Sequence, residues 1–430
     1  MGLLAQLSAQ RALTGAGERK MPSAENAGST PNHPGGRPPF ITRVMLSDYR
    51  SIRACDVTLG PLTFLVGPNG SGKSNFMDAL RFVTDALRSS LEHALRDRGG
   101  INELTYRGSP PLSRFGIRID FQMSPQTLGS YSLCIGELDD YGDYVVLEEN
   151  CAIGDARFRV REGVLIDSPS QVAPPASKDR LYLVNAAGLP EFRAAFDALS
   201  NMGFYNLHPD QLRALQPPGS GERLARDGSN LPSVLERLEK QEVPVKQRIE
   251  EYLKAIVPNL DGVSALRIGH METLEFNQWV AGLASCASFP PTAMSDGTLR
   301  ALGILVALFQ TRAEPRLRLV GIEEPEIALH PAAAGVLRDA LRDASQDSQI
   351  IVTSHSPELL DDPSIQADEI LSVVSDHGRS IIAPVDAETR SALKDRLYTA
   401  GELLKANQLS PDRQAVPQAD QLKLWEHGTE

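Results

Sequence analysis

Cysteine is scarce in this sequence, and the cysteines that occur are not paired. Four are scattered through 430 residues, at Cys55, Cys134, Cys151 and Cys286, with no C-x-x-C motif. This spacing supports neither a disulfide framework nor a cysteine-based zinc site. Reduced thiols, as in a cytoplasmic protein, are the simplest interpretation.

Long apolar runs are also missing. No run approaches the ~20 residues that a transmembrane helix requires. Polar residues follow Met1–Leu4 too soon for the apolar core of a signal peptide. We therefore expect a cytoplasmic protein with no membrane partner. Hydrophobic residues make up 41% of the sequence, as in ordinary globular proteins, and the length allows one large or two medium domains.

Basic residues are fewer than acidic residues. The 43 Lys and Arg residues are outnumbered by 55 Asp and Glu residues, for a formal net charge of −12. A generally basic nucleic-acid-binding protein is therefore excluded, and any DNA contact would need a local basic patch. Acids interleave the arginine-rich stretch 88–98, which favours a solvated face over a DNA-facing one. The candidates for contacts with DNA phosphates are Arg50, Arg53, Arg88, Arg96, Arg98, Arg223 and Arg226.

One glycine-rich stretch, residues 67–74, fits the pattern G-x-x-x-x-G-K-[ST]. The apolar run at 62–66 predicts a buried strand before it, and apolar residues at helical spacing predict a helix after it that ends near 87–90. A strand, a glycine loop and a helix start together present backbone N–H groups to an anion. This context favours a phosphate-binding loop over a chance turn, with Lys73 reaching the β and γ phosphates and Ser74 ligating Mg²⁺.

Two acids follow a second apolar strand, at residues 317–322. Glu323 is predicted to hold Mg²⁺ directly or through water, and Glu324 to act as the general base that polarises the attacking water. A third buried strand, at 350–352, is followed by His355, which can reach the γ-phosphate as a switch or sensor. These positions predict one reaction centre built from three strand ends.

The sequence Ser295-Asp296-Gly297 opens an apolar helix. Ser295 is expected to cap this helix, which leaves a helix N-terminus ready to receive an anion. Because the motif precedes the acid pair, we interpret it as a signature loop that grips the γ-phosphate of a nucleotide held by the opposite subunit.

The remaining segments have coarser predictions. Residues 1–38 contain too few apolar side chains for their burial to offset the entropy lost on ordering, so a disordered leader is expected. Alternating residues from 115 to 164 predict an antiparallel meander at one edge of the nucleotide domain. The region that follows lacks unbroken heptads, which predicts a compact insert with two short helices that break at Pro244, followed by strands between 266 and 280. A polar helical tail, frayed past about Asn407, is expected to end the chain.

In combination these motifs resemble those of the AAA-family predicted ATPases with ABC-type heads, relatives of the SMC and RecF proteins and of the ATPase half of OLD nucleases. The likeness rests on the phosphate loop, S-D-G-T-L-R, I-E-E-P-E-x-x-L-H-P and T-S-H-S-P-E-L-L-D, and runs from about Phe40 to Asp386. It implies an α/β fold, a P-loop NTPase of the ABC/SMC head type with an antiparallel β edge and a compact inserted helical lobe. The expected boundaries are 39–165 for the N-terminal ATPase lobe, 166–290 for the insert, 291–390 for the C-terminal ATPase lobe and 391–430 for the tail.

The resemblance implies an ATP-hydrolysing switch that dimerises on binding ATP. It also implies DNA and a separate effector or nuclease as partners, in DNA repair or antiphage defence. Because only a short stretch follows His355, a nuclease in the same chain is not expected. The implied site residues are Lys73, Glu324 and His355 for catalysis, Ser74 and Glu323 for Mg²⁺, and Gly67, Asn69, Gly70, Ser71, Gly72, Lys73, Ser74, Asn75, Ser295 and Gly297 for ATP.

Two departures and two alternatives accompany the resemblance. His330 falls where transporter-type heads carry an aspartate in the dimer-contact loop, and no glutamine is assigned to the Q-loop. A nucleotide-binding subunit of a membrane transporter remains an alternative, although S-G-G-Q would be expected there in place of S-D-G-T. A binding module that ATP stabilises without turnover is the other, although the presence of both acids speaks against it.

Overall fold

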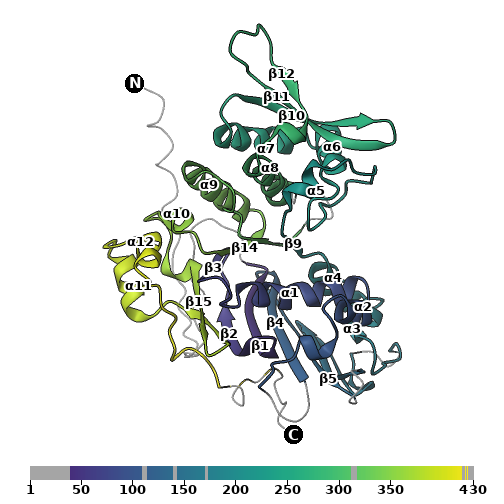
Figure 1. The fold of residues 1–430 in the computed structure, drawn as a ribbon. Coiled ribbons are helices and arrows are strands. Elements are labelled where there is room, and N and C mark those ends of the chain that lie inside the picture. Colours follow the sequence, from purple (N-terminus) through teal and green to yellow (C-terminus); the bar gives the residue numbers. More distant parts are fainter. Residues whose placement is uncertain are drawn as a thin grey trace, which may run out of the picture. The chain divides into compact units, whose positions relative to one another are not determined.

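The computed structural model describes residues 39–108, 114–138, 143–169, 173–310, 317–418, 422 and 424. The predicted leader at 1–38 therefore lies outside the described residues. A six-stranded sheet carries the predicted phosphate loop, and all its strands are parallel to their neighbours except β16 (Figure 1). Its strands in spatial order are β16 (Arg379–Pro384), β15 (Ile370–Asp376), β3 (Leu62–Val66), β14 (Gln349–Ser354), β13 (Leu319–Glu323) and β9 (Gly203–Tyr205).

Helices cover both faces of this sheet. Successive residues of a strand point to opposite faces, and β3 shows this directly. Leu65 packs in the core that includes residues of α1 (Lys73–Arg88), whereas Phe64 and Val66 pack with α8 (Asp296–Phe309) and α9 (Ala334–Ser345). Since both faces are buried, the central strands are continuous apolar runs rather than alternating ones. The end of α1 at Arg88 confirms the predicted limit.

A second, seven-stranded antiparallel sheet contains the predicted meander. The meander does not extend the six-stranded sheet; instead it continues from β1, which pairs with β4. Apolar residues of β1, β4 and β5 share a core with α1. The order is β2 (Ile52–Thr58), β1 (Ile41–Tyr49), β4 (Arg114–Ser124), β5 (Thr127–Glu137), β6 (Tyr144–Ile153), β7 (Ala156–Arg161) and β8 (Val164–Asp167).

The predicted break at Pro244 is confirmed, because Pro244 lies in the first turn of α7, where its missing N–H costs nothing. The strands expected between 266 and 280 are also present, in a three-stranded sheet. The boundary of the insert stays a prediction, but α4 packs with α1 and β9 belongs to the main sheet. The elements here are α3 (Tyr182–Ala186), α4 (Pro190–Ser200), α5 (Pro209–Arg213), α6 (Leu231–Gln241), α7 (Val243–Ile256), β10 (Leu260–Ile268), β11 (Met271–Gln278) and β12 (Ala287–Phe289).

The expected fraying past Asn407 is wrong for the residues that follow directly. Leu409 is buried, Asp386 N–H donates to Ser410 O (3.0 Å), and Asp412 N–H donates to Pro384 O (2.8 Å), so this stretch pairs with the end of β16. Among the described helices, none has the length and apolar character needed to cross a bilayer. The remaining helices are α2 (Leu91–Arg96), α10 (Pro357–Leu360), α11 (Ala387–Lys394) and α12 (Ala400–Lys405).

Candidate functional site

Three of the predicted site segments leave the six-stranded sheet at the same edge. The phosphate loop follows β3, the acid pair ends β13, and His355 follows β14. The parallel register pairs Glu323 with Thr353 and Ser354 with Val66, so the three strand ends are level. Segments that are far apart in sequence are therefore neighbours at the carboxyl end of the sheet, where open α/β sheets bind their ligands.

Glycine is required at two positions of the loop. A Cβ on Gly67 would lie 1.9 Å from Val373 O, and a Cβ on Gly72 would lie 2.0 Å from Ser380 Oγ. Gly72 also has φ +108°, a left-handed conformation that residues with a side chain rarely adopt. The loop is thus pressed against β15 and β16, which fixes where α1 begins.

Lys73 is the buried cation of the loop. Its Nζ donates to Gly67 O (2.7 Å) and Pro68 O (3.0 Å), and it lies 4.0 Å from Glu324 Oε1. Burial lowers the pKa of Lys73, against the opposing effect of the Glu324 and Glu326 carboxylates. The buried Ser71 hydroxyl has no hydrogen-bond partner within the part of the chain that the structure describes. A buried orphan hydroxyl beside a lysine and a helix N-terminus is what an anion such as a phosphate would satisfy.

The outer residues of the loop are open. Asn69, Gly70 and Ser74 are exposed, and the Asn75 amide donates to Ser51 Oγ (2.6 Å). The described residues hold no cluster of three or more His, Cys, Asp or Glu side chains suited to a metal. Mg²⁺ needs no such cluster, because it takes one or two protein ligands and completes its shell with water and phosphate oxygens. Ser74 and Glu323 fit that requirement.

Glu324 is held in a left-handed conformation, with φ +43°. Its N–H donates to both the carbonyl (3.0 Å) and the hydroxyl (3.1 Å) of Thr353, which stabilises this backbone. The carboxylate Oε1 lies 3.3 Å from His355 Nδ1 and 4.0 Å from Lys73 Nζ. The three predicted catalytic side chains are thus brought together.

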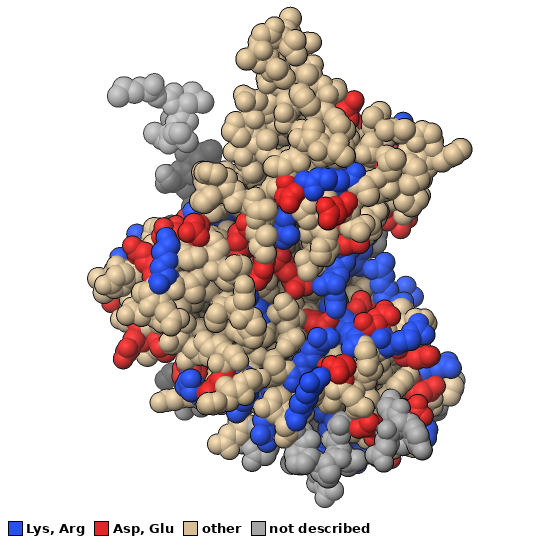
Figure 2. Space-filling model, viewed as in Figure 1, with Lys and Arg blue, Asp and Glu red and all other residues tan. Residues whose placement is uncertain are grey.

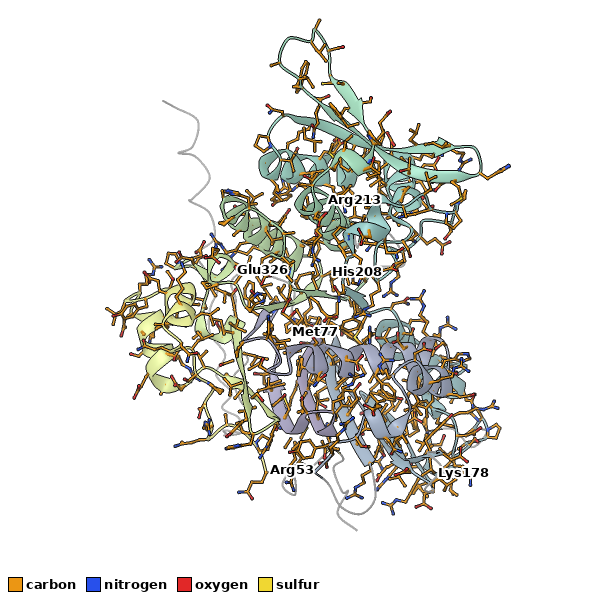
Figure 3. All side chains as sticks on the ribbon, in the orientation of Figure 1. Arg53, Met77, Lys178, His208, Arg213 and Glu326 are labelled. Atoms are coloured by element: carbon orange, nitrogen blue, oxygen red, sulfur yellow. The ribbon has the colours of Figure 1, made fainter. Side chains whose placement is uncertain are left out.

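Glu326 is a site residue that the sequence analysis did not assign. Its Oε1 accepts hydrogen bonds from Ser354 Oγ (2.7 Å) and from His355 N–H (3.2 Å), while its Oε2 is buried without a partner in the described structure. Figure 3 labels it on the segment that follows β13. Its contacts tie the acid loop to the segment that carries His355. The third acid of the E-E-P-E sequence was the signal for this role.

The Ser295-Asp296-Gly297 turn packs against the same acid loop. Ser295 Oγ accepts from Thr298 N–H (3.2 Å), which confirms the predicted cap. A Cβ on Gly297 would lie 2.3 Å from Ala328 O, so the start of α8 touches this loop directly. The exposed Asp296 forms an ion pair with Arg213, which Figure 3 places in the insert. Within the described chain, no hydrogen bond links Ser295 or Gly297 to residues 67–75.

Two arginines that were not predicted as site residues reach the acid pair. Arg226 Nη2 donates to Glu323 Oε1 (3.0 Å), and Arg300 Nη2 donates to the Glu324 carbonyl (3.2 Å). Burial lowers the pKa of Arg300, and the Glu326, Glu324 and Asp296 carboxylates oppose this shift. No local pattern marks these residues, because each contact joins segments that are far apart in sequence.

The strand next to the acid pair is followed by an asparagine. Tyr205 pairs with Ile322 in parallel register, so Asn206 follows β9 at the level of Glu323. His330, one of the two departures from the resemblance, accepts from Ala332 N–H through Nδ1 (3.2 Å) and caps a short turn.

The candidate DNA contacts separate into two groups. Arg98 is buried and paired with Asp78 (3.0 Å) and Asp85 (2.8 Å), so its interpretation as a DNA contact is wrong. Arg50 also pairs with Asp78. Figure 2 shows Lys and Arg atoms gathered on one face below the insert. In the described part of the chain, the arginines that are exposed and lack an ion pair are Arg53, Arg88 and Arg96 from the candidate set.

Comparisons with known proteins agree with this arrangement. A family model described as "AAA domain, putative AbiEii toxin, Type IV TA system" matches residues 62–129 and 223–361. An OLD nuclease of Thermus scotoductus is 26% identical over 375 residues, which cover 82% of this chain and 66% of that protein. A DNA replication and repair protein RecF of Vibrio vulnificus is 44% identical over 41 residues, 9% of this chain and 11% of that protein. The chain thus spans less than two thirds of the length of these relatives.

Solved SMC heads share the fold. A head bound to the C-winged helix domain of ScpA has a TM-score of 0.53 at 15% identity, covering 82% of this chain and 99% of that one. A head with an extended coiled coil, bound to the C-terminal domain of ScpA derived from Pyrococcus furiosus, has a TM-score of 0.50 at 15% identity, covering 84% and 99%. The predicted fold class is therefore confirmed. By sequence and fold the chain is therefore similar to OLD and RecF proteins and to SMC heads, and its sheet and loop are those of a P-loop fold of the ABC/SMC head type.

Proposed function

We propose that this chain binds Mg·ATP at residues 67–75 and hydrolyses it. The observation that carries the proposal is the convergence of Glu324 with His355 (3.3 Å) and Lys73 (4.0 Å) at the strand ends that flank the loop. A general base beside a phosphate-binding lysine is the arrangement that phosphoryl transfer to water requires. A module that only binds ATP has no use for it.

The loop binds the triphosphate. Lys73, now bonded to two carbonyls of its own loop, exchanges them for phosphate oxygens, and the Ser71 hydroxyl gains the partner it lacks. Ser74 and Glu323 would hold Mg²⁺, which would neutralise charge that develops on the phosphates. Asn206, beside Glu323, takes the Q-loop position.

Glu324 accepts the proton of the attacking water. Its backbone bonds to Thr353 hold the carboxylate in place, so it needs no reorganisation during the reaction. His355 contacts this carboxylate through Nδ1, and Glu326 fixes the backbone of His355. His355 is thus positioned to report on the γ-phosphate.

A second copy completes the site. Ser295 and Asp296 are exposed at the start of an apolar helix and make no bond to their own phosphate loop in the described chain, which supports binding to the nucleotide of a partner. Exposed Ile327 on the acid loop would be covered in such a dimer. ATP-driven closure and hydrolysis-driven opening then act on DNA, through exposed arginines, or on a separate effector protein. The RecF relative supports a role in DNA repair, and antiphage defence is the other role that the resemblance implies.

The test is Glu324→Gln, which keeps the size of the side chain and removes the base. We expect unchanged affinity for a nonhydrolysable ATP analogue and a fall in turnover of ~10²-fold or more, the scale of general-base catalysis. Glu388→Gln, on the exposed surface of α11, is the matched control and should keep full turnover. Unchanged turnover in Glu324→Gln would refute its role, and absence of turnover in the wild type would favour a binding module.

A further inference from the structure

Arg226 forms an ion pair with Glu323, the carboxylate that is proposed to hold the metal. Its Nη2 donates to Glu323 Oε1 at 3.0 Å, and the pair is partly open to water, with 46% of the Arg226 side chain and 20% of the Glu323 side chain exposed. The contact spans 97 residues of sequence. A cation from the inserted segment therefore lies where Mg²⁺ is expected.

The loop that presents Arg226 is built to hold it there. Asn206 N–H donates to Arg226 O (2.9 Å), which joins this loop to the segment beside β13. Ala225 N–H donates to Asn230 Oδ1 (2.7 Å), and Asn230 Nδ2 donates to Arg223 O (2.7 Å), so one asparagine closes the loop from both sides. Gln310 Oε1 accepts from Leu224 N–H (2.8 Å) and fastens the loop to the end of α8. Because these hydrogen bonds hold the backbone of the loop, they position the Arg226 guanidinium next to Glu323.

We infer that Arg226 is a positioning residue that serves as the resident cation of Glu323 in the absence of metal, and that Mg²⁺ must displace it. This inference rests on the proposed function, because it takes Glu323 to be a metal ligand. Glu323 carries a single negative charge, and a guanidinium 3.0 Å from its Oε1 repels a hydrated Mg²⁺ ion that approaches the same carboxylate. Arg226 and the metal therefore compete, and binding of Mg·ATP frees the arginine and the loop that leads into α6.

Competition has a measurable consequence for nucleotide binding. Without metal, Arg226 screens Glu323 from the phosphates, so its removal weakens nucleotide binding or leaves it unchanged. With metal, its removal eliminates a competitor and a positive charge next to the ion. Both effects raise the ratio of nucleotide affinity in Mg²⁺ to nucleotide affinity in EDTA, by about three- to tenfold for an ion pair of this exposure.

The experiment measures that ratio with a fluorescent nonhydrolysable ATP analogue. We expect the ratio to rise about three- to tenfold in Arg226→Ala. In Arg226→Lys the ratio should lie between those of the wild type and Arg226→Ala, because lysine keeps the charge but lacks the planar guanidinium. Arg193→Ala, which removes an exposed arginine that is ion-paired with Asp197 on α4, should leave the ratio unchanged. In a Glu323→Gln background, Arg226→Ala should have no further effect.

The outcomes separate the two proposals. If Glu323→Gln lowers the ratio but Arg226→Ala does not raise it, Arg226 and Mg²⁺ do not compete. The proposed function would still stand in that case. A wild-type protein that binds no nucleotide, or whose ratio is insensitive to Glu323→Gln, would overturn the metal site itself. A rise in the Arg226→Ala ratio that persists in the Glu323→Gln background would show that Arg226 acts elsewhere.

Discussion

Gly297 is the point at which α8 meets the acid loop, and its replacement by alanine tests that packing. The added Cβ would lie 2.3 Å from Ala328 O, whereas ordinary contacts begin near 3.4 Å. Either the helix start or the loop must therefore move by about 1 Å. Ala328 already adopts a left-handed φ of +66°, which leaves its backbone little freedom to yield.

The cost can be separated from helix propensity by a matched control. Gly297 is the second residue of α8, and Gly335 is the second residue of α9. A Cβ on Gly335 would meet nothing closer than the end of the Arg338 side chain, at 3.7 Å. Replacing either glycine by alanine should stabilise its helix by the same amount, up to about 1 kcal/mol, because alanine has the higher helix propensity. Only Gly297→Ala incurs overpacking, of about 1–3 kcal/mol.

The assay is urea unfolding of both variants in the same buffer without nucleotide. We expect Gly297→Ala to be less stable than Gly335→Ala by about 1–3 kcal/mol. ATP turnover should also fall in Gly297→Ala alone, because the displaced loop carries Glu326, which bonds to the His355 segment. Equal stability of the two variants would refute the close contact between α8 and the loop.

Two further predictions concern the dimer interface and the response to pH. Ser295→Arg should abolish ATP-dependent dimers in light scattering, because a bulky side chain would replace the exposed cap that we propose to contact the partner's nucleotide; dimers that persist would rule out the trans role. Glu149 is buried among the Tyr131 hydroxyl and the Tyr182 and Leu183 N–H groups, and burial raises its pKa to about 7. Folding therefore favours its protonated form, so its contribution to stability is present at low pH and is lost as the pH rises toward and past 7. Glu149→Gln should gain stability relative to wild type between pH 5 and pH 8 in thermal unfolding, and a pH-independent difference would contradict the burial argument.

Much of the site could be predicted from local pattern. The strand before Lys73 is a short continuous apolar run and the helix after it repeats at a period of 3.6, and both signals are properties of neighbouring residues. Glu323, Glu324 and His355 were predicted because each follows an apolar strand. The break at Pro244 followed from the geometry of one residue. All of these features depend on fewer than about 20 consecutive residues.

The contacts that complete the site could not be predicted in this way. Arg226 was considered only as a DNA contact, and Arg98 was placed on a solvated face because acids interleave the stretch 88–98. The structure instead pairs Arg226 with Glu323 and buries Arg98 against Asp78. No local pattern distinguishes an arginine that will meet a distant carboxylate from one that will face water.

By itself, the sequence determined the strand, loop and helix around Lys73 and the acids that follow β13. Backbone conformation and hydrophobic period are set by adjacent residues, so they can be read along the chain. Only the tertiary structure decided that the meander joins β1, that Asn206 follows the strand beside β13 and that Arg226 reaches Glu323. Those contacts arise when the whole chain packs, because strand pairing and ion pairing between distant segments depend on which faces are brought together.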